Sequence, residues 1–164
     1  MNWYVYIMSF GGNLGEREKT ADEALALLSS FGNVGRQSRW HYTHPLVSTD
    51  YDVSDHGEYL NFVFEFSTSL APSELYLRVR AIEDHFGRDR SRRWLPRAAD
   101  IDLLLCSHAV TDSDKFVPEG HFSYREAGGD LQIPHAELGK RLFLLDMIKT
   151  DLKLELATLL KSDE

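Results

Sequence analysis

The sequence has a single cysteine, more acidic than basic residues and no long apolar run. Cys106 alone cannot form an internal disulfide, and no CxxC or Cys/His spacing typical of a zinc site is present. The 18 Lys and Arg against 26 Asp and Glu give a formal net charge of −8, whereas general nucleic-acid surfaces usually carry a net basic footprint. No stretch approaches the roughly 18 apolar residues of a membrane span. We therefore expect neither a nucleic-acid partner nor a membrane partner.

The first ten residues, MNWYVYIMSF, are apolar but short, contain no basic residue and run directly into glycines. We interpret them as a first strand and not as a signal peptide. With the single cysteine, this predicts a cytoplasmic protein, and we expect a monomer. The 164 residues, 43% hydrophobic and 27% charged, fit one globular domain over residues 1–164 with a substantial core.

The first half of the chain alternates strand and helix patterns. Apolar residues alternate over residues 3–9 with the two-residue period of a strand, and after GGNLG they recur at helical spacing until Gly32, the expected stop. The stripe of this predicted helix is Ala21, Ala24, Leu25, Leu28 and Phe31. Further strands are predicted over residues 35–43 and 60–66. In the latter, the side chains expected on one face are Leu60, Phe62, Phe64 and Phe66, and those on the other are Asn61, Val63 and Glu65.

The second half contains the clearest predicted helix, which begins near Pro72 and ends at Gly87. Its stripe is Leu75, Val79, Ile82 and Phe86. Residues 99–106 predict a strand and residues 107–130 a long polar excursion. A final helix is expected to carry Leu152, Leu156, Leu159 and Leu160. This order predicts an α+β fold, a ferredoxin-like sandwich with a largely antiparallel sheet and helices packed on it.

Two aspartates interrupt the apolar run in RRWLPRAADIDLLLC, which spans residues 92–106. In a strand, Asp100 and Asp102 share one face, about 6 to 7 Å apart. The residues expected to point to the other face, into the core, are Ile101, Leu103 and Leu105. Two carboxylates at this distance repel each other unless a cation lies beside them, and Mg²⁺ takes carboxylate oxygens while retaining waters and substrate phosphates. The pair therefore indicates a magnesium site.

Six of the 18 basic residues are arginines between residues 80 and 97, which indicates a local anion site on an acidic protein. The arginines nearest the aspartates, which would hold phosphate oxygens that the metal does not reach, are Arg88, Arg90, Arg92, Arg93 and Arg97. Alternatively, both aspartates simply pair with these arginines on a solvated face. The coincidence of RxR, RW-PR and DxD within one short stretch favours the site.

These motifs resemble the 6-hydroxymethyl-7,8-dihydropterin pyrophosphokinase family. RRWLPRAADIDLLL is similar to the family signature R-W-G-P-R-x-x-D-[ILV]-D, with Leu95 in the glycine place. SFGGNLGEREK, YLNFVFEFSTSLAPSELYLRVRAIEDHFGRDR and IPHAELGKRLFLL resemble further family segments in the same order. The resemblance covers most of the chain. It implies transfer of pyrophosphate from ATP, the co-substrate, to hydroxymethyl-dihydropterin in folate biosynthesis, with AMP as leaving group and two Mg²⁺ ions as cofactors.

The resemblance also implies roles for individual residues. Asp100 and Asp102 would hold the two Mg²⁺ ions. With the phosphate-binding arginines Arg88 and Arg97 they would form the catalytic set. The implied ATP-binding residues are Glu83, Arg90, Trp94, Leu103, His135 and Arg141. The implied pterin-binding residues are Thr43, Leu46, Tyr59, Asn61 and Phe143.

Elementary chemistry agrees with two of the pterin roles. A flat heterocycle with a polar edge suits an aromatic stacking face and a bifunctional amide, which Phe143 and Asn61 supply. From the residues alone, core packing is the favoured explanation of Phe143. The alternative for Asn61 is a turn or strand edge, and the alternative for His135 is an ordinary loop. Asn61 nevertheless falls in mid-strand, where asparagine is depleted.

Departures from the family pattern keep alternatives open. Leu95, Gly12, His44 and Asp130 replace residues that the family usually has. They motivate an alternative in which the chain is a catalytically degenerate pterin- or nucleotide-binding protein with the same fold. A ferredoxin-like RNA-binding domain is a second alternative, and it would need exposed sheet aromatics beside basic charge.

Overall fold

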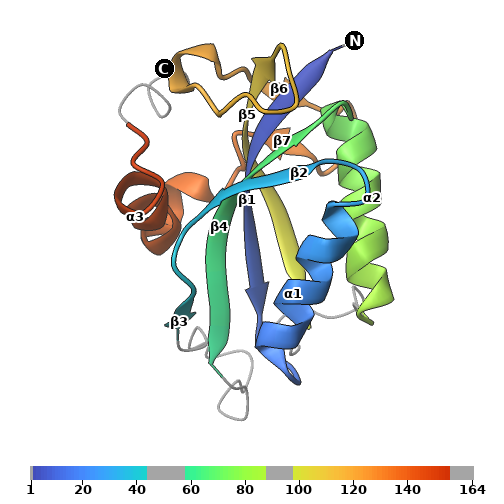
Figure 1. The fold of residues 1–164 in the computed structure, drawn as a ribbon, viewed down its shortest axis with the longest axis vertical. Helices are drawn as coiled ribbons and strands as arrows, with labels where there is room; N and C mark the ends of the chain where they lie inside the picture. The colour runs from blue at the N-terminus through green and yellow to red at the C-terminus, as the bar shows by residue number, and fades with distance from the viewer. Residues whose placement is uncertain (1, 44–57, 88–97, 156–164) are drawn as a thin grey trace.

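The computed structural model describes residues 2–43, 58–87 and 98–155 (Figure 1). In chain order, its strands and helices are β1 (Trp3–Gly12), α1 (Arg17–Leu28), β2 (Asn33–Gln37), β3 (His41–Thr43), β4 (Tyr59–Thr68), α2 (Pro72–His85), β5 (Asp100–Ala109), β6 (Tyr124–Arg125), β7 (Gln132–Ile133) and α3 (Leu142–Thr150). Short 3₁₀ turns cover Pro118–Gly120 and Leu138–Lys140.

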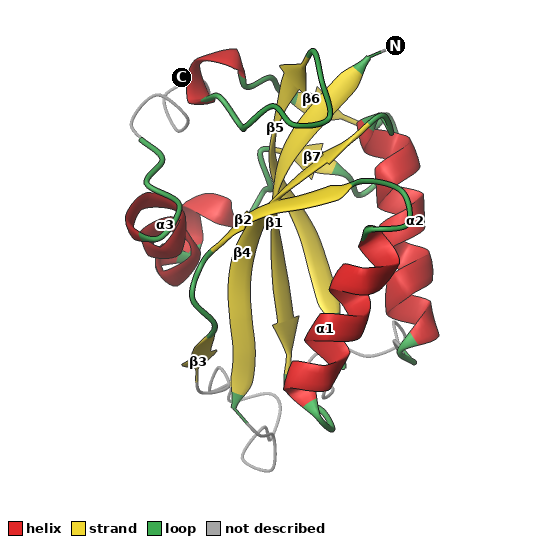
Figure 2. Ribbon diagram, in the orientation of Figure 1, coloured by secondary structure: helices red, strands yellow, loops and turns green. Residues whose placement is uncertain are grey.

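The main sheet is antiparallel, with strand order β2-β4-β1-β5 and with β3 also paired to β4. Helices α1 and α2 cover one face of this sheet, and α3 covers the other (Figure 2). The two faces are called here the α1/α2 face and the α3 face. This architecture confirms the predicted α+β, ferredoxin-like sandwich.

Each face of the sheet has its own apolar core, as strand alternation requires. The predicted alternation of β4 is confirmed. Its residues in the α1/α2 core are Leu60, Phe62, Phe64 and Phe66, whereas Val63 lies in the α3 core. On the α3 face, Glu65 is also buried and accepts hydrogen bonds from the Arg36 guanidinium. Asn61 and Glu65, which alternate with these phenylalanines, therefore lie on the α3 face.

The prediction that Leu105 shares a face with Ile101 and Leu103 is wrong. Ile7 lies opposite Leu105 and Met8 lies opposite Leu103, so Leu104 is an extra residue in β5. Such a bulge shifts the alternation by one residue, and both Leu104 and Leu105 pack in the α3 core. Ile101 and Leu103 precede the bulge and pack in the α1/α2 core, as predicted. Asp100 and Asp102 consequently face α3.

Helix α2 agrees with its prediction, since Pro72 begins it and Gly87 follows it with φ +81°. Helix α1 instead ends at Leu28, before the expected stop at Gly32. Gly32 instead allows close packing against Phe66, because a Cβ at this position would lie 2.3 Å from Phe66 Cζ. The strand predicted over residues 35–43 is divided into β2 and β3, and β5 continues to Ala109.

The prediction of a final helix carrying Leu152 is wrong, because α3 ends at Thr150. Its buried stripe is Leu144, Met147 and Ile148. Lys153 adopts φ 58°, and the Leu154 N–H donates to the Ile148 carbonyl at 3.2 Å. Leu156, Leu159 and Leu160 lie outside the described residues.

Candidate active site

Four residues form one row across the ends of four strands on the α3 face. Asp100 of β5 lies opposite Gly11 of β1, Gly11 lies opposite Asn61 of β4, and Asn61 lies opposite His41 of β3. Neighbouring strands are about 4.8 Å apart, so the Cα atoms of Asp100 and Asn61 are separated by roughly 10 Å. Gly11 carries no side chain, and an added Cβ would lie 3.2 Å from Asn61 Oδ1. The row thus places a residue without a side chain between a carboxylate and an amide.

Asp102 lies two residues along β5 and contacts two groups from the segment that precedes α3. Arg141 Nη1 donates a hydrogen bond to Asp102 Oδ2 at 3.2 Å, and His135 Nε2 lies 3.7 Å from Oδ1. Burial by itself raises the pKa of Asp102, but the hydrogen bonds and charges of His135 and Arg141 outweigh it and hold that pKa below its usual value. The carboxylate is therefore ionised at neutral pH, with 22% of its side chain exposed.

His135 is oriented by hydrogen bonds of its main chain and of its ring nitrogen Nδ1. Its N–H donates to the Leu104 carbonyl at 3.0 Å, and its Nδ1 accepts the Glu137 N–H at 3.1 Å. A neutral ring that accepts at Nδ1 carries its proton on Nε2. That proton points to Asp102, so the imidazole is a donor at this position in either protonation state.

Glu83 and Leu103, both predicted to bind ATP, are buried at 7% and 2% exposure. Glu83 Oε2 accepts the Ile101 N–H at 2.9 Å, between the two aspartates. The Leu103 side chain packs in the α1/α2 core, which leaves only its main-chain groups for a ligand.

The predicted pterin-binding residues Thr43, Tyr59 and Asn61 lie together where β3 pairs with β4. Thr43 is opposite Tyr59 in the register. Asn61 Nδ2 donates to Thr43 Oγ1 at 2.7 Å and to the Tyr59 carbonyl at 3.3 Å. Asn61 is 7% exposed in mid-strand, so the interpretation of this residue as a turn residue does not apply.

Phe143 is 43% exposed in the first turn of α3, two residues after Arg141. The alternative explanation of Phe143, core packing, is therefore wrong. An aromatic ring that is accessible in this way is suited to stacking on a flat ligand.

Five of the predicted site residues lie outside the described residues, namely Leu46, Arg88, Arg90, Trp94 and Arg97. Of the ten described ones, all but Leu103 and Phe143 fall into two groups on either side of Gly11. One group contains Asp100, Asp102, Glu83, His135 and Arg141, and the other contains Thr43, Tyr59 and Asn61. The sequence interpretation did not include Gly11 among the site residues, although the GGNLG motif at the end of the first strand could have indicated it.

The buried aromatic residues of β4 exclude one alternative function. Phe62, Phe64 and Phe66 are at most 1% exposed beneath α1 and α2. RNA-binding sheets of this class stack bases on exposed aromatics, so this row of side chains cannot serve as such a platform.

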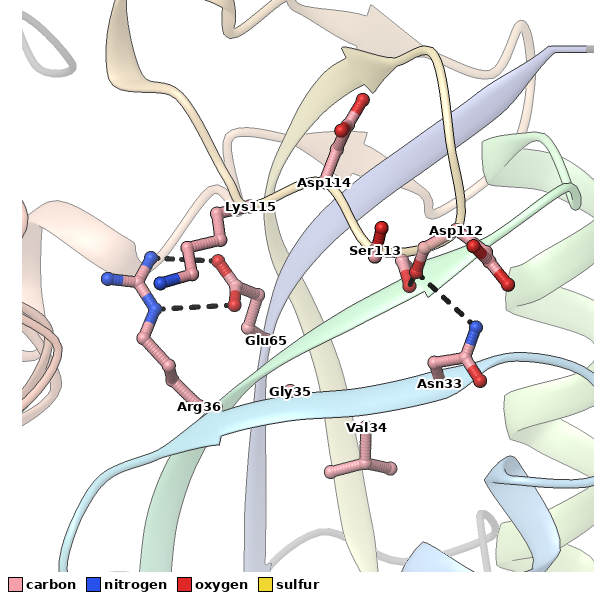
Figure 3. Close-up of a pocket in the computed structure, with 10 residues that line it drawn as sticks. Asn33, Val34, Gly35, Arg36, Glu65, Asp112, Ser113, Asp114 and Lys115 are labelled. Atoms are coloured by element: carbon pink, nitrogen blue, oxygen red, sulfur yellow. Dashed lines mark hydrogen bonds and ion pairs between the residues drawn. The ribbon is translucent and has the colours of Figure 1, made fainter.

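A cavity of about 400 Å³ lies between β2 and the segment after β5 and contains none of the predicted site residues (Figure 3). Arg36 donates to Glu65 through Nη2 at 2.8 Å and through Nε at 3.3 Å. Glu65 Oε2 also accepts the Phe116 N–H at 2.7 Å. Because the half-buried Arg36 and the Phe116 N–H satisfy the buried Glu65 carboxylate, the cavity wall is a structural junction between the sheet and the segment after β5.

Within residues 2–43, 58–87 and 98–155, no cluster of three or more His, Cys, Asp or Glu side chains has the arrangement of a metal site. Over the same ranges, each helix is too short or too polar to cross a bilayer.

Comparison with known proteins gives consistent matches over the region that holds both groups. The model of the 7,8-dihydro-6-hydroxymethylpterin-pyrophosphokinase family matches residues 7–151. The 2-amino-4-hydroxy-6-hydroxymethyldihydropteridine pyrophosphokinase of Bacillus subtilis is 32% identical over 147 residues, which cover 88% of this chain and 75% of the relative. That of Aquifex aeolicus is 29% identical over 138 residues, 84% of this chain and 74% of the relative. A folate synthesis bifunctional protein of Chlamydia trachomatis is 32% identical over 148 residues, 90% of this chain and 30% of the relative.

Proposed function

The chain belongs to the 7,8-dihydro-6-hydroxymethylpterin-pyrophosphokinase family, and from this premise we propose how its residues act on ATP and the pterin. The family predicted from the sequence motifs is confirmed, and the chain is a pterin pyrophosphokinase of folate biosynthesis. The observation that carries this conclusion is the family match over residues 7–151. Nothing in the comparisons favours the catalytically degenerate alternative.

The reaction joins the hydroxymethyl oxygen to the β-phosphorus of ATP. The bond between that phosphorus and the α,β-bridging oxygen breaks, its electron pair stays with AMP, and the hydroxymethyl proton passes to water. Phosphoryl-type transfers depend on positioning and charge neutralisation more than on covalent chemistry by the protein. The roles proposed for the chain's residues are accordingly those of holding and neutralising.

Asp100 and Asp102 are proposed to hold Mg²⁺ beside the ATP phosphates. Two carboxylates on one face of β5 fit this ion, which is usually bound by one or two carboxylates, by waters and by substrate phosphates. The lowered pKa of Asp102 keeps that ligand ionised. When bound, Mg²⁺ neutralises phosphate charge and favours ionisation of the attacking hydroxyl.

His135 and Arg141 are proposed to contact the nucleotide beside Asp102. Both present N–H donors there, at 3.7 Å and 3.2 Å from the carboxylate, and such donors suit phosphate and ribose oxygens. The phosphate-binding roles of Arg88 and Arg97 and the ATP-binding roles of Arg90 and Trp94 remain predictions from the sequence, as does a cytoplasmic monomer.

Asn61 and Thr43 are proposed to recognise the polar edge of the pterin, with Phe143 and Tyr59 beside the ring. Thr43 Oγ1 accepts from Asn61 Nδ2, so the threonine hydroxyl retains its own proton as a donor. Asn61 Oδ1 is an acceptor next to Gly11. An adjacent donor and acceptor match the lactam edge of a pterin, which offers a carbonyl oxygen and an N–H.

The test is product analysis with the purified protein, ATP, Mg²⁺ and 6-hydroxymethyl-7,8-dihydropterin. We expect AMP and the pterin diphosphate in equal amounts. Release of ADP with a pterin monophosphate would refute transfer of pyrophosphate. Tight pterin binding by folded protein without AMP release would support the degenerate alternative instead.

A further inference from the structure

Glu83 places a buried carboxylate against the main chain that carries the two aspartates. It lies in the last turn of α2 and is 7% exposed. Its Oε2 accepts the N–H of Ile101 at 2.9 Å, and Ile101 is the residue between Asp100 and Asp102. A hydrogen bond from a main-chain N–H to a carboxylate is of the charge-assisted, stronger kind.

The contact occurs at the outer edge of β5, the last strand in the sheet order. In an antiparallel pair, alternate residues direct their N–H and C=O groups towards the partner strand and away from it. Outward groups at a buried edge need other partners. Farther along β5, the His135 main chain supplies one by donating to the Leu104 carbonyl at 3.0 Å. At Ile101, the Glu83 carboxylate is the partner of the outward N–H.

Glu83 approaches from the face of the sheet opposite to the aspartate side chains. Ile101 packs in the α1/α2 core with Val79 and Ile82 of α2, while Asp100 and Asp102 project to the α3 face. The carboxylate therefore reaches the strand between the aspartates without occupying the face on which they project. Through the Ile101 amide, it fixes the backbone from which both side chains extend.

We infer that Glu83 is a positioning residue that holds Asp100 and Asp102 in place through the main chain of β5. The inference rests on the metal-binding role proposed for the two aspartates. Because small displacements of positioned groups cost large factors in rate, the length of the Glu83 side chain and its acceptor oxygen are the required features. Its negative charge is secondary.

Glu83→Gln and Glu83→Asp separate these features. Glutamine keeps the reach and an acceptor oxygen but removes the charge, whereas aspartate keeps the charge but is one methylene too short. We expect Glu83→Gln to retain the wild-type kcat within about threefold and Glu83→Asp to lower kcat about tenfold or more. In Glu83→Asp the Mg²⁺ concentration for half-maximal rate should also rise. Glu74→Gln and Glu74→Asp, at an exposed position of the same helix, are the matched controls and should leave both values unchanged.

Amide hydrogen exchange at Ile101, followed by NMR, gives a readout that does not depend on turnover. The Ile101 amide should exchange about tenfold faster in Glu83→Asp than in wild type, and close to the wild-type rate in Glu83→Gln. A Gln variant that is inactive beside an active Asp variant would overturn the inference, because charge would then be the required feature. Unchanged Ile101 exchange in Glu83→Asp would overturn it too. If wild type releases no AMP, the proposed function fails by itself, and Ile101 exchange with calorimetry of Mg²⁺ and an unreactive ATP analogue still decides the role of Glu83.

Discussion

Asp100 and Asn61 lie on either side of Gly11 in one cross-strand row, so that a carboxylate and an amide flank a residue without a side chain. The proposed reaction needs an opening here, because the pterin hydroxymethyl group must approach the phosphates beside the carboxylates. In this proposal, the register of three strands sets the spacing of the two substrates.

Gly11→Ala tests this opening. The added Cβ would lie 3.2 Å from Asn61 Oδ1, and the amide has little room to retreat because its nitrogen donates to Thr43 and Tyr59. We expect the KM for the pterin to rise about tenfold with little change in the KM for ATP, as measured by AMP release. Gly120→Ala is the control, since its Cβ would find only ordinary contacts at 3.9 Å and beyond. An unchanged pterin KM in Gly11→Ala would show that the amide does not read the pterin.

Asp102→Ala separates a metal ligand from a simple ion-pair partner. We expect it to lower transfer about 100-fold or more while the protein stays folded, because the pair with the 37%-exposed Arg141 is worth only about 0 to 1 kcal/mol. MgATP should raise the melting temperature of wild type and not that of the variant. Asp146→Ala, at an exposed position of α3, is the control. Near-normal turnover in Asp102→Ala would refute the metal-site proposal.

Phe143→Ala tests the proposed stacking face. The ring is 43% exposed, so its removal should leave the melting temperature nearly unchanged. A lost stacking contact of about 1 to 1.5 kcal/mol should raise the pterin Kd about tenfold, measured by calorimetry with an unreactive ATP analogue present. Phe143→Tyr should bind as wild type does, and Leu142→Ala, at a 73%-exposed neighbour, should have no effect. A large loss of stability with unchanged pterin binding would assign the ring to packing.

The sequence predicted those parts of the fold that depend on local pattern. The alternation of β4, the proline and glycine that bound α2, and the shared face of Asp100 and Asp102 all follow from the periods of strands and helices. The bulge at Leu104 does not follow from such a period. Residues 103–105 are all leucines, so the sequence does not show which of them is the extra residue. The end of α3 was missed for a related reason. Leucines continue at helical spacing beyond Thr150, but α3 ends there and the backbone becomes left-handed at Lys153.

The site was predictable as a set of residues but not as a set of contacts. The motif matches named Asp102, His135 and Arg141, yet their pairing joins positions 33 and 39 residues apart. Glu83 was predicted as a nucleotide contact, whereas its hydrogen bond to Ile101 depends on how α2 packs beside β5. Such contacts follow from tertiary packing, and no period in the sequence reports them.

Asp151 links the end of α3 to Arg39, between β2 and β3, and to His41 of β3, and these contacts predict a pH dependence of stability. Its carboxylate, 7% exposed, accepts the Arg39 N–H at 3.0 Å and lies 3.1 Å from His41 Nε2. Burial by itself raises the pKa of Asp151, but the hydrogen bonds from His41 and Arg39 outweigh it, and that pKa is lowered from its ordinary value of 3.8. A carboxylate whose pKa is lower in the folded state stabilises the fold above its unfolded pKa and loses this contribution as pH falls through the folded pKa.

Asp151→Asn should therefore lower the free energy of unfolding at pH 7, with the full difference from wild type present above about pH 5. The difference should shrink as the pH falls below about 4, where the wild-type carboxylate takes up its proton. Urea unfolding of both proteins at several pH values measures this, and Asp22→Asn, at an exposed position of α1, controls for the general change in charge. A difference that stays constant from pH 7 to below the folded pKa would mean that the geometry of Asp151, and not its ionisation, holds α3 to the sheet. A difference that grows as the pH falls below about 4 would contradict the lowered pKa directly.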